Sequence, residues 1–135
     1  MIQVGDTYSL EYQFTQQQVN SFCEVTGDNN PVHYDADYAA TTPFKVPIIH
    51  GFLGGSVFSR VFGTMFPGEG TIYLKQEMNF LRPMYVDTLY TAQFEVLEVI
   101  AEKNRIRVST KVSNVEGKET ISGEAIVQNP KVTEA

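Results

Sequence analysis

Two residues whose side chains can exchange protons stand close together early in the chain. His33 follows Asp28 by five positions, across a turn formed at Pro31. Near neutral pH an imidazole can give or take a proton, and a carboxylate can orient it or share a water molecule with it. This spacing lets both side chains point into one cavity as an acid–base pair. Such a spacing is more often a plain turn with a hydrogen-bonded histidine, so these two residues alone favour the structural interpretation and leave the acid–base pair as the alternative.

A second chemical feature is the pair His50-Gly51, which is predicted to open a helix. A helix N-terminus presents unpaired N–H groups and a partial positive charge. Gly51 has no side chain to block an approaching oxygen, so its N–H could stabilise negative charge that develops on a carbonyl oxygen. Glycine at this position would also allow a helix to pack closely on a sheet. His50 itself is expected to be structural, at the entry to the helix.

The helix that begins at Gly51 is predicted to span residues 51–66 and to be buried on nearly all sides. Large apolar side chains crowd it: Phe52, Leu53, Val57, Phe58, Val61, Phe62, Met65 and Phe66. A stripe of small residues recurs at every fourth position: Gly51, Gly55, Ser59 and Gly63. A glycine in mid-helix costs about 1 kcal/mol relative to alanine. We therefore expect a neighbouring element or a ligand to lie close to this small face.

The elements ahead of the central helix are predicted from capping signals. Residues 2–14 contain an entry loop and a first strand, with apolar side chains at alternate positions. A helix over 15–26 should begin at Thr15, with Gln18 completing a capping box, and end at Gly27. A short helix is expected over 35–42, with Asp35 as its cap.

The second half of the chain is predicted to be strands. Apolar and polar residues alternate within 72–80, 91–96, 105–112 and 121–127. The links at 103–104 and 116–118 are hairpin turns. Such short links exclude parallel crossovers, so the sheet is expected to be antiparallel. One long helix against an antiparallel sheet is an α+β architecture, and 135 residues fit one domain, 1–135.

Composition excludes several classes of function. The formal net charge of -6 argues against a nucleic-acid partner. Cys23 is the only cysteine, which rules out a disulfide framework or a cysteine-based metal site. The N-terminus has no basic and apolar leader pattern, and no apolar run approaches bilayer length. We therefore expect a cytoplasmic protein without membrane association, without a bound metal and without a redox cofactor.

The chemical residues belong to a long pattern that is specific to one family. Gly-Asp-x-Asn-Pro-x-His-x-Asp spans residues 27–35, and His-Gly follows at 50–51. This pattern closely resembles the hydratase motif of MaoC-like dehydratases, and within them the single-domain (R)-specific enoyl-CoA hydratases. The likeness extends over nearly the whole chain. It implies the hot-dog fold, in which an antiparallel sheet wraps a long helix, in agreement with the order of elements predicted above.

The resemblance also implies roles for individual residues. Asp28 and His33 match the pair that activates water, and the Gly51 N–H matches the donor to the thioester oxygen. Two further matches are supporting positions. Asn30 shapes the active-site loop, and Ser59 stands where these hydratases carry a serine near the aspartate.

Substrate contacts are expected from Phe52, Gly55 and Phe62. Phe52 stands where Met or Leu is common in the family, so the shape of the pocket is expected to differ. The implied reaction is syn addition of water to a 2-enoyl-CoA, with a (3R)-hydroxyacyl-CoA as the product. Coenzyme A enters only as part of the substrate. The resemblance further implies a homodimer or a higher homo-oligomer.

Two other functions compete with the hydratase. A hot-dog acyl-CoA thioesterase would place a carboxylate on the central helix to activate water against the carbonyl. Residues 51–66 contain no Asp or Glu, which counts against this alternative. A non-catalytic acyl-thioester binding module would keep the fold but would be free to lose the pair. The presence of Asp28, Asn30, His33 and Gly51 together argues against it.

Overall fold

The alternating segments of the second half form three long strands. The computed structural model describes residues 1–135. Within it, β4 (Tyr90–Ile100), β5 (Arg105–Ser113) and β6 (Glu119–Gln128) pair antiparallel in sequence order. The predicted inward positions of 91–96 and 105–112 are buried, and Thr110 joins them. The turns also follow the prediction, because Asn104 and Gly117 take the positive φ angles that tight hairpins require.

The sheet is completed by strands from the first half and the middle of the chain. Its order is β1-β4-β5-β6-β2, where β1 is Thr7–Tyr12 and β2 is Ile72–Gln76. The predicted strand over 72–80 is divided, because β3 (Asn79–Phe80) pairs with β6 separately. The break lies where the backbone crosses Gly123 so closely that a Cβ there would collide with the Glu77 carbonyl.

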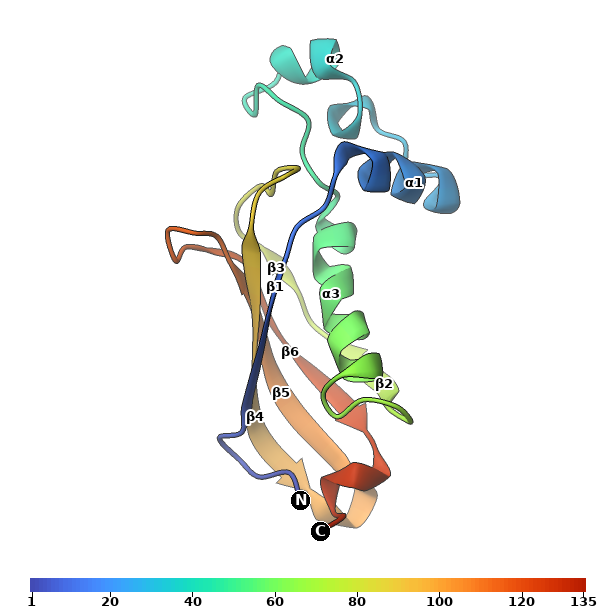
Figure 1. Cartoon of the computed structure of the whole chain (residues 1–135), viewed down its shortest axis with the longest axis vertical. Helices are drawn as coiled ribbons and strands as arrows, with labels where there is room; N and C mark the ends of the chain where they lie inside the picture. The colour runs from blue at the N-terminus through green and yellow to red at the C-terminus, as the bar shows by residue number, and fades with distance from the viewer.

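The long helix α3 (Gly51–Thr64) lies along one face of this sheet (Figure 1). It ends two residues before the predicted boundary. Phe58, Val61 and Phe62 are fully buried, and the rings of Phe58 and Phe62 meet Phe94 of β4 edge to face. This confirms the predicted α+β architecture, with a helix packed on an antiparallel sheet.

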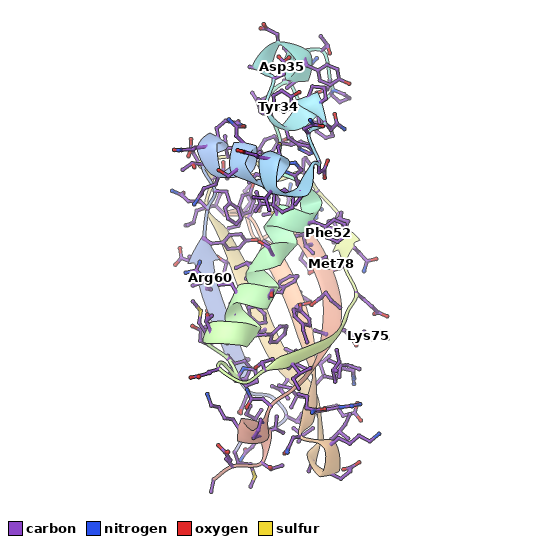
Figure 2. The ribbon with its side chains drawn as sticks, turned by 90° about the vertical axis from the view of Figure 1, so that its right-hand side faces the viewer. Tyr34, Asp35, Phe52, Arg60, Lys75 and Met78 are labelled. Atoms are coloured by element: carbon purple, nitrogen blue, oxygen red, sulfur yellow. The ribbon has the colours of Figure 1, made fainter.

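Two methionines approach the glycines in the first half of α3, Gly55 of the predicted small stripe and its neighbour Gly54. A Cβ on Gly54 would lie 2.8 Å from the sulfur of Met84, and one on Gly55 would collide with the sulfur of Met78. Figure 2 shows Met78 beside the helix. The close neighbour expected at the small stripe is therefore a protein side chain at Gly51 and Gly55, whereas Ser59 and Gly63 are exposed. Methionine fits the position because its unbranched, flexible side chain fills irregular gaps.

The two remaining α-helices project beyond one end of the sheet (Figure 1). They are α1 (Gln16–Thr26) and α2 (Ala36–Ala40), joined through a 3-10 helix at Pro31–His33. We call residues 15–47 the overhang. The predicted capping box of Thr15 and Gln18 is present, and Gly27 ends α1 with a φ of 76°. None of the helices has both the length and the apolar character needed to cross a bilayer.

Candidate active site

His33 is held in place by the turn that the sequence predicted. Asn30 caps the 3-10 helix, its side chain accepting a hydrogen bond from the Val32 N–H, and Pro31 fills the next position. The ring of His33 is oriented by the Ile48 carbonyl, which lies 2.8 Å from Nδ1. A carbonyl oxygen can only accept, so Nδ1 carries the proton and Nε2 of the neutral ring is a bare acceptor.

The second histidine lies directly against the first. The rings of His33 and His50 are stacked, with centroids 3.7 Å apart and planes inclined by 25°. His50 is 2% exposed. Its Nε2 lies 2.8 Å from the Asp28 carbonyl and 3.5 Å from the Cys23 sulfur. The sequence had predicted a structural residue at the helix entry, but not this contact with both members of the pair.

Asp28 and His33 are brought together as predicted. Single ligand atoms of Asp28, His33 and His50 all lie within 4.8 Å of one another. The carboxylate of Asp28 is exposed and accepts no hydrogen bond from the protein, while its backbone N–H donates to the Thr26 hydroxyl. An exposed carboxylate and an imidazole nitrogen thus lie close enough together for one water molecule to contact both.

Burial governs the electrostatics behind the pair. It lowers the pKa of His50, an effect that the hydrogen bond to the Asp28 carbonyl opposes and the neighbouring His33 reinforces. Burial also raises the pKa of the Cys23 thiol, and the charge of Asp28 adds to this. Both groups are therefore held neutral. Cys23 and His50 thus form an uncharged support behind the Asp28/His33 pair. The exposed carboxylate of Asp28 is the charged group among these residues.

The same three residues are donor types that a divalent transition metal could use. Stacked imidazoles direct their in-plane lone pairs along neighbouring, nearly parallel planes. Two such lone pairs do not converge on one ion at bonding distance. The Nδ1 of His50 is in addition fully buried. The arrangement is thus suited to holding a water molecule between Asp28 and His33, and poorly suited to chelation.

Gly51 supplies the predicted helix terminus next to this pair. His50 caps α3 without a side-chain hydrogen bond, and the Gly51 N–H donates to no protein acceptor. The ring of Phe80 lies over the glycine, and a Cβ there would be 2.7 Å from its Cε1. Both interpretations of Gly51 therefore have support. The absence of a side chain lets the Phe80 ring pack closely on the helix, and the Gly51 N–H remains free to bind an oxyanion.

A mainly apolar pocket of about 400 Å³ opens beside Gly51. Phe52, which is 67% exposed, and Phe80 line it. Arg82 is the only cationic residue in the lining, and its guanidinium donates to the Glu119 carbonyl at 2.6 Å. The pocket thus places an apolar surface, fit for an acyl chain, next to the free N–H of the helix terminus.

Three other predicted residues lie away from this pocket. Gly55 is buried beneath Met78, and Phe62 is fully buried between Phe94 and Tyr73. Ser59 is exposed in the second half of α3 and makes no hydrogen bond through its side chain. Within one chain, therefore, only Phe52 of the expected substrate contacts borders the pocket, and Ser59 is not brought to Asp28.

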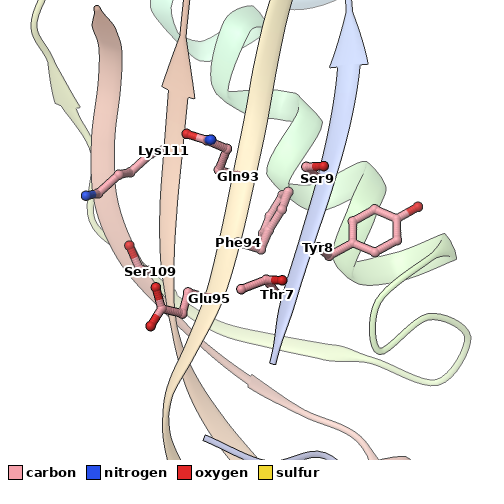
Figure 3. Close-up of a pocket in the computed structure, with 8 residues that line it drawn as sticks. All are labelled: Thr7, Tyr8, Ser9, Gln93, Phe94, Glu95, Ser109 and Lys111. Carbon is pink, nitrogen blue, oxygen red and sulfur yellow. The ribbon is translucent and has the colours of Figure 1, made fainter. Parts of the chain in front are cut away.

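The largest pocket, about 630 Å³, lies elsewhere, on the face of the sheet turned away from α3 (Figure 3). Its lining is mostly polar: Thr7, Ser9, Gln93, Glu95, Ser109 and Lys111, with Tyr8 and Phe94 between them. Glu95 and Lys111 are its only charged groups, and it contains no histidine. Size alone would favour this groove, but the N–H that could bind a developing oxyanion, that of Gly51, lies in the lining of the smaller pocket.

Comparisons with known proteins identify the family to which the chain is similar. The family model described as "MaoC like domain" matches residues 3–118. The 3-hydroxybutyryl-CoA dehydratase of Methylorubrum extorquens is 37% identical over 99% of this chain and 85% of its own length. The (R)-specific enoyl-CoA hydratase of Aeromonas caviae is 36% identical over 96% of each chain.

Solved structures give the same result. The (R)-hydratase from A. caviae involved in PHA biosynthesis superposes with a TM-score of 0.92, covering 96% of this chain and 98% of its own. The R-hydratase PhaJ1 from Pseudomonas aeruginosa, in the unliganded form, is 42% identical. Its TM-score is 0.90 over 96% of this chain and 83% of its own.

Proposed function

The chain belongs to the MaoC-like dehydratase family, and from this premise we propose that it adds water to the double bond of a 2-enoyl-CoA. The proposed product is a (3R)-hydroxyacyl-CoA, and the reaction is reversible. The relatives from M. extorquens and A. caviae are named for the two directions of such a reaction. One observation carries the proposal: Asp28 and a ring nitrogen of His33 share a small volume, and His50, which contacts both residues, directly precedes a helix terminus with a free N–H.

The proposed mechanism divides the work between two groups. The thioester carbonyl accepts a hydrogen bond from the Gly51 N–H. This hydrogen bond stabilises the negative charge that develops on the carbonyl oxygen. A water molecule bound between Asp28 and His33 attacks C3 of the enoyl group. The pair accepts one proton from the water and delivers one to C2, so that H and OH are added across the former double bond. Both side chains end the cycle in their starting state.

The surroundings of the pair support this chemistry. The acyl chain would lie in the apolar pocket lined by Phe52 and Phe80, beside the Gly51 N–H. No metal or redox group takes part in the proposed reaction, and coenzyme A enters as part of the substrate. We further propose a cytoplasmic location, since the only cysteine, Cys23, is an unpaired thiol.

The proposal is tested by incubating the purified protein with crotonyl-CoA and longer 2-enoyl-CoA substrates. We expect the absorbance of the conjugated enoyl thioester to fall and chiral analysis to find the (3R) product. An (S) product would overturn the stereochemical assignment. Saturated butyryl-CoA is the matched control for the thioesterase alternative. Release of free thiol from butyryl-CoA, with no 3-hydroxyacyl-CoA formed from the enoyl substrates, would replace the hydratase by a hydrolase.

We also propose a homodimer formed through the edge of the sheet at β2. Apolar side chains are exposed along this edge and beside it: Phe52 at 67%, Ile72 at 52% and Phe80 at 50%. An uncovered apolar edge strand favours pairing with a second chain. Wild-type protein should sediment at twice the protomer mass, and Ile72→Lys should shift it towards the monomer. Val115→Lys, in an exposed turn, is the control that should remain dimeric. A monomeric wild type would contradict the proposal.

A further inference from the structure

One buried side chain contacts both members of the acid–base pair. His50 lies at the junction between the overhang, which carries Asp28 and His33, and α3, which begins at Gly51. Its Nε2 is 2.8 Å from the Asp28 carbonyl, and its ring stacks on that of His33. The proposed water site and the proposed carbonyl site therefore meet at this single residue.

The hydrogen bond defines the tautomer of His50. The Asp28 carbonyl can only accept, so Nε2 must carry the proton. Nδ1 is buried and has no hydrogen-bond partner. A second proton on Nδ1 would therefore create a buried N–H without an acceptor in a ring that is 2% exposed. The geometry favours a neutral ring with its proton on Nε2.

The neutral state of His50 matters for its neighbours. Three titratable groups face the ring: Cys23 from α1, Asp28 from the following loop and His33 from the 3-10 helix. The fourth neighbour is the apolar ring of Phe22. A cationic His50 would repel a proton arriving on the stacked ring of His33. A neutral His50 leaves His33 able to accept that proton during the reaction.

We propose that His50 is a positioning residue, a neutral clamp that aligns the Asp28 backbone through Nε2–H and the His33 ring through stacking. This proposal deepens the proposed function, on which it rests for its kinetic consequence. His50 does not contact the reacting atoms. It holds the two groups that do, and it joins them through the backbone to the Gly51 N–H. A displacement of about 1 Å in such a pair lowers rates by about a hundredfold.

A pair of amide substitutions separates this role from simple packing. In His50→Gln the amide nitrogen can reach the position of Nε2, whereas in His50→Asn it reaches only the position of Nδ1. We expect His50→Asn to lower kcat by about a hundredfold with KM changed less than threefold, and His50→Gln to recover at least tenfold of that loss. Equal kcat values for the two variants, or values within twofold of wild type, would overturn the proposal.

A second buried polar residue provides a control that separates a loss of kcat caused by destabilisation from one caused by lost positioning. Asn129 is 1% exposed and donates to the carbonyls of Gly68 and Glu69, on the opposite side of the fold from the pair. Asn129→Ala should lower the thermal midpoint while kcat stays near wild type. If Asn129→Ala lowers kcat as much as His50→Asn does, at an equal loss of thermal midpoint, the effect of His50 is structural and the proposal fails.

Nuclear magnetic resonance gives a readout that does not depend on activity. The chain has two histidines, so a spectrum of 15N-histidine-labelled protein contains two rings. We expect one of them to remain neutral and protonated on Nε2 down to a pH below 6.5, the ordinary midpoint of histidine, and to disappear in His50→Gln. A doubly protonated or Nδ1–H ring at position 50 would overturn the proposal. If wild type lacks hydratase activity, the proposed function fails while this measurement still decides the state of His50.

Discussion

Replacing Asp28 with Asn should lower kcat/KM for a 2-enoyl-CoA by at least about a hundredfold, as removal of a positioned acid–base group does. The amide keeps the size of the side chain but cannot accept and return a proton. The carboxylate is exposed and makes no hydrogen bond within the protein, so folding should be little affected. Stopped-flow or steady-state loss of enoyl absorbance, alongside thermal unfolding, measures both quantities.

The overhang offers a matched control for this substitution. Asp37 is another exposed carboxylate, in the first turn of α2, and its side chain forms no hydrogen bond or ion pair. Asp37→Asn makes the same change of charge in the same part of the fold and should leave kcat/KM within about twofold of wild type. Full activity of Asp28→Asn would remove Asp28 from the mechanism. Equal losses in both variants would point to the charge of the overhang in place of a catalytic carboxylate.

Removing the N–H of Gly51 should have an effect of similar size. Gly51→Pro deletes this donor at the first helical position, where proline is readily accepted. The preceding residue, His50, already has the extended backbone that proline requires, with φ -55° and ψ 136°. Loss of one oxyanion donor lowers kcat by about a hundredfold to a thousandfold. Steady-state kinetics with crotonyl-CoA measures this loss.

Gly51→Ala is the control for the added bulk. Both substitutions place a Cβ within 2.7 Å of the Phe80 ring, but only alanine keeps the N–H. The informative quantity is therefore the ratio of kcat between the two variants, and it should be at least about tenfold in favour of alanine. If alanine and proline reduce kcat equally, Gly51 acts by admitting Phe80, and the donor to the thioester oxygen lies elsewhere.

Local sequence signals predicted much of this structure. The strands β4 and β5 follow from strict alternation, because one face of each packs against α3. The capping box at Thr15 and the left-handed Gly27 define α1 from side-chain chemistry alone. The turn at Pro31 brought Asp28 and His33 into reach of each other, as their spacing predicted. In the last two cases the determining interactions lie within a few residues of chain, and in the first the alternation itself can be followed locally although the packing partner is distant.

Features that depend on contacts distant in the sequence were not predicted. The break between β2 and β3 arises from the approach of Glu77 to Gly123, 46 residues apart by their numbers. The orientation of His33 depends on the carbonyl of Ile48, and no side chain signals that contact. The stack of His33 on His50 had one available clue, since the only two histidines both lie in the segment that leads to the central helix.

The division of the molecule into overhang and core has a consequence for how activity fails. Only Val19 of residues 15–47 belongs to the main hydrophobic cluster, which is otherwise built from β1, α3, the strands that follow and the segments between them. Segments with few buried apolar contacts open at a lower free energy than the core does. Asp28 and His33, which are proposed to activate water, lie in the less stable overhang. Gly51, the proposed donor to the carbonyl, lies in α3, which belongs to the more stable core. On warming, the overhang should therefore separate from the core first. The enzyme should lose activity at a temperature at which its sheet is still intact.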